Sequence, residues 1–212
     1  AYAASKDEKY VEGFWTLFLS WMTSNPPQRG INWQCGQEIA IRTMACTVAL
    51  YAFWRSPHTT ADRVALMVTF LAASAERIAG NINYARAQMG NHAVSEATAI
   101  YTVGTLFPEI KHAEQWCKLG RFVLEDEARR FNWPDGSYTQ HSMNYQRLML
   151  HGYVWALRLG ELNGERFAPH LSESIRRSWE FLFQVQDCAT GCTPNYGPND
   201  GALILPLNDC SY

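Results

Sequence analysis

Hydrophobic residues recur at helical intervals along most of the chain, and no alternating pattern predicts a convincing strand. Ser5 and Glu8 have the spacing of a capping box, which predicts a helix start there. Asn25, Pro26 and Pro27 predict its end. The apolar face of this first helix comprises Val11, Phe14, Trp15, Phe18 and Met22.

Six further helices are expected after the first. Thr59 or Thr60 caps the third helix of the chain, Pro108 opens the fifth, Ser142 caps the sixth and Pro169 opens the seventh. The second is apolar over most of its circumference, as expected for an inner helix. The expected ranges are 36–55, 60–89, 92–107, 108–131, 142–159 and 169–186.

Helices of this length with short connections predict an all-α chain of antiparallel hairpins, curved into a solenoid or a toroid. No fixed repeat period is present, which disfavours tetratricopeptide-type arrays. A toroid would leave polar groups at the ends of its inner helices, where they line a cleft. After Gln186 the helical pattern gives way to Gly, Pro, Asn and Asp, as in a loop.

Composition limits the possible functions. The 212 residues are 47% hydrophobic and 13% aromatic, which is typical of a globular domain. The formal net charge of -2 argues against a nucleic-acid-binding surface. The longest apolar run, Met44 to Trp54, is too short for the roughly 20 residues that cross a bilayer, so no membrane partner is expected. The first residues contain neither a start Met nor a signal-peptide core, which favours a chain cut from a longer precursor.

The cysteines predict no metal site. Cys46 and Cys117 lie in helical patterns, where a free thiol acts as a small hydrophobe. Cys188 could pair with Cys192 or Cys210, but their spacing is not that of a zinc site. No cofactor is expected either.

Polar side chains able to bind a sugar carboxylate and to move a proton gather at two places. Asn91 and His92 open the expected helix 92–107, and Tyr145 lies near the start of the helix 142–159. Tyr138 and His141 precede that helix and are further candidates for contact with a substrate. Taken alone, Asn91 is more simply a helix cap, and Tyr145 a core tyrosine.

An ordered set of short motifs resembles the helical N-terminal domain of the heparinase II/III-like polysaccharide lyases, a family that is also similar to alginate and oligoalginate lyases. The likeness extends from about residue 32 to the end of the chain. The motifs are Trp33-x-x-Gly36-Gln37-Glu38-x-x-x-Arg42, Gly90-Asn91-His92 with Glu96, Leu106-Phe107-Pro108, Asp135-Gly136-Ser137, Ser142-x-Asn144-Tyr145, and residues 194–202 from Pro194 to Ala202.

This resemblance implies an incomplete (α/α) toroid over residues 1–186. Residues 187–212 are then a loop that leads toward a C-terminal β-sandwich domain absent from this chain. The implied substrate is an acidic polysaccharide or oligosaccharide, and the implied location is periplasmic or secreted. Complete members draw part of their site from the sandwich, so the helical chain alone is expected to show little activity.

The implied reaction is β-elimination, in which an enzyme removes the C5 proton of a uronic acid and helps to expel the oxygen on C4. Asn91 and His92 would neutralise the carboxylate through their N–H donors. Tyr145 matches the tyrosine that serves as acid and base, provided that its neighbours lower its pKa. Glu96 lies one helical turn after His92 and could orient the imidazole.

The motif near residue 36 offers further contacts with a sugar. Trp33 could stack on a pyranose ring and Arg42 could meet a carboxylate, while Gln37 and Glu38 line the same groove. Equally, Glu38 and Arg42 could form an i,i+4 salt bridge that fixes the helix start.

Two other functions remain open. A helical toroid can host a glycoside hydrolase, whose two carboxylates would come from Glu38, Asp135 and Asp200. A non-catalytic glycan-binding module is the third possibility. Asn195, Tyr196 and Asp200 are otherwise interpreted as an ordered turn.

Overall fold

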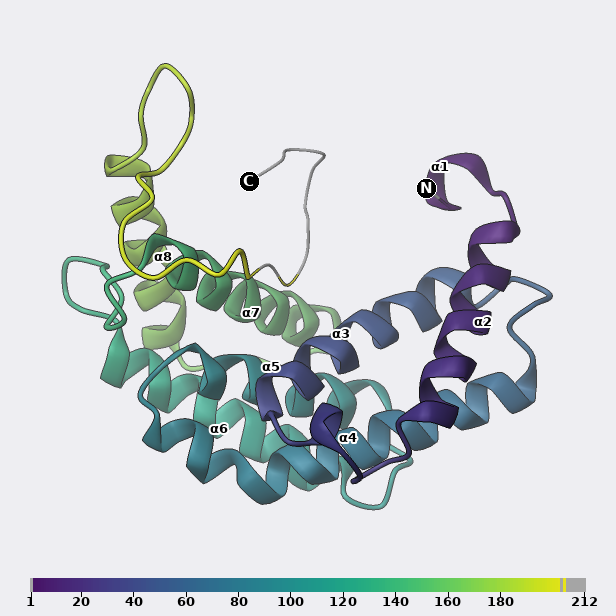
Figure 1. Ribbon diagram of the computed structural model, residues 1–212. Helices are drawn as coiled ribbons and strands as arrows, with labels where there is room; N and C mark the ends of the chain where they lie inside the picture. Colours follow the sequence, from purple (N-terminus) through teal and green to yellow (C-terminus); the bar gives the residue numbers. More distant parts are fainter. Residues whose placement is uncertain (1, 203, 205–212) are drawn as a thin grey trace.

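The computed structural model describes residues 2–202 and residue 204, and within them every regular element is a helix. Figure 1 shows these helices as an open arc that runs from α2 at one end to α8 at the other. The elements are α1 (Tyr2–Ser5), α2 (Lys9–Ser24), the 3-10 helix η1 (Ile31–Trp33), α3 (Gly36–Phe53), α4 (Ala61–Ala87), α5 (Asn91–Leu106), α6 (Ala113–Phe131), α7 (Met143–Leu162) and α8 (Pro169–Gln184). The chain is thus an incomplete toroid of antiparallel helical hairpins, as the sequence predicts.

Helix α5 is the centre of the domain, because it packs against α3, α4, α6 and α7. Its side chains are buried on all sides, including residues 93–104 without a break. Helices α3 and α7 flank it, so the three form the inner layer, while α4 and α6 lie outside them (Figure 1). This order places the N-terminal ends of three inner helices side by side.

Two glycines allow α5 and α6 to approach closely. A Cβ atom on Gly120 of α6 would lie 2.7 Å from the carbonyl oxygen of Ala97 and 2.8 Å from the amide nitrogen of Tyr101. A Cβ atom on Gly104 of α5 would lie 2.5 Å from the amide nitrogen of Cys117. Because these neighbours are backbone atoms, no side-chain rotation could make room for a methyl group.

Helix α2 joins the domain through aromatic side chains. Phe18 and Trp21 both meet Phe70 of α4 edge to face, with ring centroids 5.6 and 5.7 Å apart. Trp33 packs against the same ring at 5.8 Å. Such pairs add stability beyond that of area burial.

Two predicted helix starts are wrong. The helix expected from Pro108 begins at Ala113, because residues 108–112 form a turn. The capping box is absent, since the side chain of Glu8 accepts hydrogen bonds from the hydroxyls of Tyr2 and Ser56 instead. The caps by Thr60 and Ser142, and Pro169 in the first turn of α8, are confirmed.

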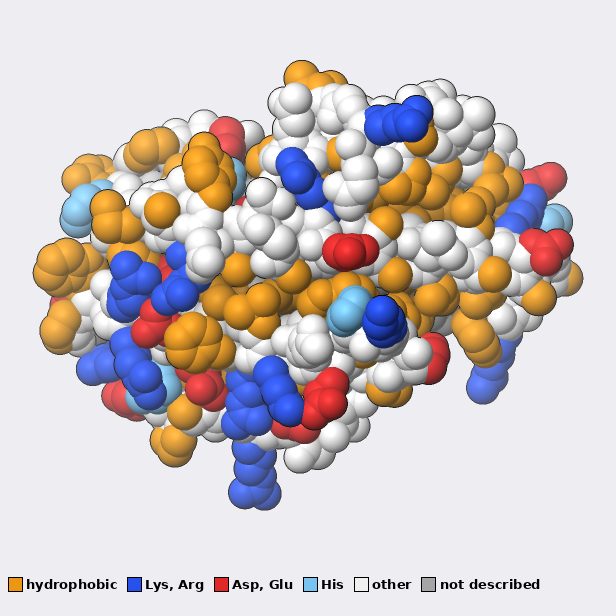
Figure 2. Space-filling view, turned by 90° about the horizontal axis from the view of Figure 1, so that it is seen from below, with side chains coloured by type: hydrophobic (Ala, Val, Ile, Leu, Met, Phe, Trp, Pro, Cys, Tyr) orange, Lys and Arg blue, Asp and Glu red, His pale blue; other side chains and the backbone are white. Residues whose placement is uncertain are grey.

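The stretch after α8 has no regular structure in its described part, residues 185–202 and 204. Cys188 and Cys192 are free thiols, and Cys210 lies outside the described residues. No helix in the described part of the chain has the length and hydropathy needed to span a bilayer. Figure 2 shows basic and acidic side chains interspersed over the lower face of the domain.

Candidate active site

The N-terminal end of α5 is fixed between its two neighbours by hydrogen bonds. The Asn91 side chain donates from Nδ2 to Oε1 of Gln37 in the first turn of α3, at 3.0 Å. The backbone N–H of Asn91 donates to Oε1 of Gln140, shortly before α7, at 2.9 Å. The start of α5 is therefore tied to both flanking inner helices.

Asn91 is buried, with 2% of its surface exposed. The helix cap is Gly90, and no side chain caps this end, so the simpler interpretation of Asn91 as a cap is wrong. The bond to Gln37 orients the amide and leaves the second Nδ2 hydrogen without a hydrogen bond among the described residues. An oriented amide N–H of this kind can bind an anion.

His92, the next residue of α5, is half-buried. Burial lowers the pKa of His92, and the negative charges of Glu38 and Asp200 oppose that change. The imidazole is therefore neutral at neutral pH, with one N–H to donate. The influence of Asp200 also places the segment after α8 within electrostatic range of the start of α5.

Tyr145 lies in the first turn of α7, where its hydroxyl donates to Oδ2 of Asp200 at 3.1 Å. Burial raises the pKa of Tyr145, and the hydrogen bond to the Asp200 carboxylate raises it further. The condition set for the acid and base role, that neighbouring groups lower this pKa, is not met. In this structure the phenol is a proton donor at neutral pH.

The sequence analysis placed Asp200 in an ordered turn or a hydrolase pair and missed its contact with Tyr145. Its Oδ1 accepts hydrogen bonds from Nδ2 of Asn144 at 3.1 Å and from the backbone N–H of Ala202 at 3.0 Å. The backbone N–H of Met143 donates to the carbonyl of Tyr196, at 3.0 Å. The turn is ordered, as expected, and it also presents a carboxylate to Tyr145. The signal was its place in the motif from Pro194 to Ala202.

Glu96 is 3% exposed and forms no hydrogen bond with His92, so the prediction that it orients the imidazole is wrong. Its carboxylate lies against the backbone of Gly36, where an added Cβ would lie 2.3 Å from Oε1. Burial raises the pKa of Glu96 to about 8. Glu96 and His92 both line a hollow of about 280 Å³ next to the start of α3.

Trp33 and Arg42 both make contacts within the domain, and those of Trp33 exclude its predicted role with a sugar. Trp33 is 2% exposed, and its indole N–H donates to the carbonyl of Asn25 at 3.1 Å, so stacking on a pyranose is wrong. Arg42 donates to the carbonyl of Asn32 and lies over the Trp21 ring. No Arg42 ion pair with Glu38 occurs in the described part of the chain, so the salt-bridge alternative is also wrong. Gln37 holds Asn91 rather than lining an open groove.

The two candidates in the loop before α7 also differ from expectation. Tyr138 is 2% exposed, and burial raises its pKa far above its usual value, so the predicted contact of Tyr138 with a substrate is wrong. His141 is exposed, with a left-handed backbone of φ 50°, and its carbonyl packs against Gly197. His141 therefore helps to seat the segment that carries Asp200.

Two of the three carboxylates considered for a hydrolase, Asp135 and Asp200, have other partners. Asp135 accepts hydrogen bonds from the backbone N–H and the hydroxyl of Ser137, which closes its own turn. Asp200 is paired with a phenol rather than a second carboxylate. Among the described residues, no three His, Cys, Asp or Glu side chains gather as metal ligands would.

The arc of helical hairpins, with an amide, an imidazole and a phenol at the ends of its inner helices, defines the class: a helical toroid domain. More particularly, the chain belongs to the heparinase II/III N-terminus family, whose model matches residues 1–198. The resemblance predicted from the motifs is thereby confirmed.

Known relatives agree with this assignment. Over 219 aligned positions, which cover the whole chain, the sequence is 29% identical to a heparin-sulfate lyase of Bacteroides thetaiotaomicron. The chain spans 30% of that relative's length. A heparinase III crystal structure superimposes with a TM-score of 0.72 at 28% identity, over 87% of this chain and 28% of the other. The crystal structure of a heparan sulfate lyase of Pedobacter heparinus superimposes with a TM-score of 0.62 at 24% identity, over 91% of this chain and 30% of the other. This second likeness shows the fold alone.

Proposed function

We propose that the protein containing this helical domain cleaves a uronic-acid-containing polysaccharide by β-elimination. The observation that carries the proposal is the Tyr145–Asp200 pair, whose carboxylate also acts on the pKa of His92, the residue next to the buried Asn91. The named activities of its relatives support the same reaction class.

Neutralising the uronate carboxylate is the first requirement, because the C5 proton is only weakly acidic beside a full negative charge. Asn91 offers its free Nδ2 hydrogen, which Gln37 holds in place, and His92 offers one ring N–H. These donors would bind the carboxylate and stabilise the charge that develops as the C5 proton leaves. A fixed donor of this kind contributes about 3 kcal/mol to transition-state binding.

Proton transfer to the leaving group is the second requirement. A base, which would belong to the part of the site outside this chain, takes the C5 proton. The C5–H electrons form the C4–C5 double bond, the C4–O bond breaks, and the departing oxygen takes a proton from an acid. Tyr145 is protonated at neutral pH and suits this acid role. For the base role it would first have to lose its own proton, which Asp200 disfavours electrostatically. Of the two proton-transfer roles, the geometry therefore favours Tyr145 as the acid.

The substrate that we propose is a sulfated or carboxylated uronate polymer such as heparan sulfate. The remaining groups of the site would come from a C-terminal β-sandwich domain of the full-length protein, toward which residues 187–212 lead. The chain itself accounts for less than a third of the matched relative.

The full-length protein should release an ultraviolet-absorbing unsaturated product from heparan sulfate or alginate. New reducing ends without that absorbance would instead indicate a glycoside hydrolase. Binding without any product would indicate a glycan-binding module. Either outcome would refute the proposed lyase activity.

Asn91→Ala and Tyr145→Phe should each lower kcat/KM about a hundredfold or more. Tyr10→Phe is the matched control, since Tyr10 lies on α2 and outside the proposed site. All three variants should keep the helical circular dichroism of the parent. Unchanged activity in both site variants would reject these residues while leaving the fold intact.

A further inference from the structure

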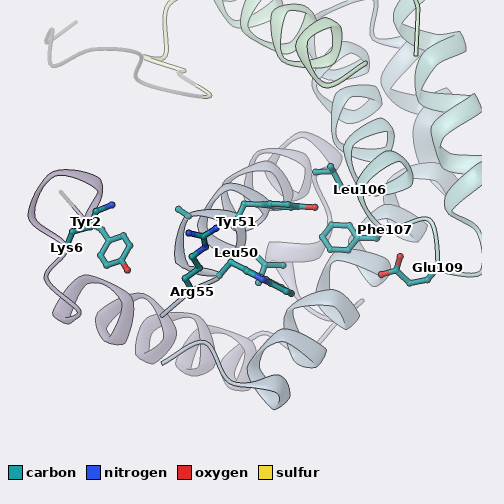
Figure 3. A pocket seen from close by; sticks show the side chains of 10 residues that line it. Tyr2, Lys6, Leu50, Tyr51, Arg55, Leu106, Phe107 and Glu109 are labelled. Carbon is teal, nitrogen blue, oxygen red and sulfur yellow. The ribbon is translucent and has the colours of Figure 1, made fainter. Parts of the chain in front are cut away.

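A large cavity lies away from the candidate active site. It has a volume of about 470 Å³, within the range of small-molecule sites, and opens at the C-terminal ends of α3 and α5. Figure 3 shows Tyr51 and Arg55 at its centre, Tyr2 and Lys6 along one side, and Glu109 on the other.

This cavity is separated from the candidate active site by most of the length of α3. Gln37, which holds Asn91, is in the first turn of α3, and Tyr51 is near its last residue. At a rise of about 1.5 Å per residue, the two positions are about 21 Å apart. A ligand in the cavity would therefore occupy a site of its own.

Two large aromatic side chains of the cavity are open to solvent. Tyr51 is 55% exposed and Trp54 is 59% exposed. Flat aromatic faces of this kind can cover the apolar C–H face of a sugar ring, while the Tyr hydroxyl and the indole N–H remain able to bond to sugar hydroxyls. Below them, Leu50 and Phe107 are buried and form a rigid floor.

Positive charge accompanies the aromatic rings. Arg55 forms no hydrogen bond or ion pair in the part of the chain that the structure describes, so its guanidinium is available to an anion. Lys6 lies over the ring of Tyr2, 5.5 Å from its centroid. Glu109 opposes them with one negative charge, across the cavity from Lys6 (Figure 3). An anionic ligand would therefore favour the side formed by Lys6 and Arg55.

The wall formed by α1 is held in place before any ligand binds. The Tyr2 hydroxyl donates to Oε1 of Glu8 at 3.1 Å, and the Ser56 hydroxyl donates to the same carboxylate. The Tyr2 ring also meets Phe53 edge to face at 5.3 Å. A preformed wall lowers the entropy cost of binding.

We propose that this cavity is a second binding site for an acidic saccharide. Tyr51 and Trp54 would pack on sugar rings, and Arg55 and Lys6 would pair with sulfate or carboxylate groups. The site goes beyond the proposed elimination, because it requires no turnover. Its effect would be to hold a polymer chain on the protein while cleavage takes place elsewhere.

The test uses the full-length protein with Tyr145→Phe, to prevent turnover, and immobilised heparan sulfate, alginate and a neutral glucan. Tyr51→Ala combined with Arg55→Ala should weaken binding of the acidic polymers at least about fivefold. Glu109→Gln should strengthen it. If the double variant loses affinity for heparan sulfate and for alginate to a similar extent, the site binds carboxylate groups. If it loses more affinity for heparan sulfate, the site binds sulfate groups.

Arg166→Ala is the matched control, since Arg166 is exposed and lies outside the cavity. In a background with Tyr145 intact, the double variant should keep its kcat on a short oligosaccharide, which separates this site from the catalytic one. Unchanged polymer affinity in the double variant would overturn the proposal, as would equal losses in the Arg166 control. Equal binding of the neutral glucan would also overturn it.

Discussion

Replacing Gly120 by alanine tests the close crossing of α5 and α6. The new methyl group would lie 2.7 Å from the carbonyl oxygen of Ala97 on α5, whereas an ordinary contact begins near 3.4 Å. The two helices would have to separate by about 0.7 Å at this point, because the obstructing atoms belong to the backbone. The same helix carries Asn91 and His92 at its start.

The magnitude follows from two opposing effects. Alanine favours a helix over glycine by about 1 kcal/mol, while overpacking of this severity costs about 3 kcal/mol. Gly120→Ala should therefore destabilise the domain by about 2 kcal/mol and lower its Tm by about 4–8 °C. Gly80→Ala is the matched control, since Gly80 lies within α4 and has nothing within 4 Å of the added atom. It should stabilise the domain by about 1 kcal/mol.

Far-ultraviolet circular dichroism during thermal or urea unfolding measures both variants, because every regular element of the described domain is a helix. Opposite signs for the two substitutions would confirm the crossing. If Gly120→Ala were as stable as Gly80→Ala, the reasoning about backbone contact would be refuted.

Three further predictions concern charged groups. Asp200→Asn should lower the pKa of Tyr145, because it removes the carboxylate that raises that pKa. A spectrophotometric titration of the phenols, with Tyr145→Phe as the reference that identifies the Tyr145 signal, measures the change. An unchanged pKa would show that the pair does not exist. Burial raises the pKa of Glu96 from 4.5 to about 8, so the folded chain keeps a proton that the unfolded chain releases. Stability should fall by up to about 5 kcal/mol as the pH rises through that window, and Glu96→Gln should remove the fall in unfolding measurements. Arg86→Met should lower the free energy of unfolding by about 3 kcal/mol, because the buried carboxylate of Glu127 loses a partner 3.1 Å away. Urea unfolding measures this change, and a decrease below about 1 kcal/mol would contradict the prediction.

Local patterns predicted the helices well, because periodicity and caps act over a few residues. Thr60 and Ser142 cap the expected helices through bonds to a nearby backbone N–H. The predicted helix start at Pro108 was wrong because the local pattern is ambiguous there: proline is compatible with both a turn and a first helical position.

The contacts that build the candidate site are long-range, and local patterns do not contain them. Gln37 and Asn91 are separated by 54 positions, and Tyr145 and Asp200 by 55. Trp33 shows a second difficulty, because a tryptophan suits a sugar platform and a buried aromatic cluster equally well. Only the packing of α2 and α4 around it decides between the two.

The segment that carries Asp200 is seated on the start of α7 by the bonds from Met143 to Tyr196 and from Asn144 to Asp200. Between α8 and this seat, residues 187–193 are mostly exposed and form no regular element. A protease that cut this stretch would leave every helix whole. Asp200 would then be held to Tyr145 by a few hydrogen bonds, without the covalent link through α8. Whether this exposed loop is intact would therefore affect the pKa of the Tyr145 phenol.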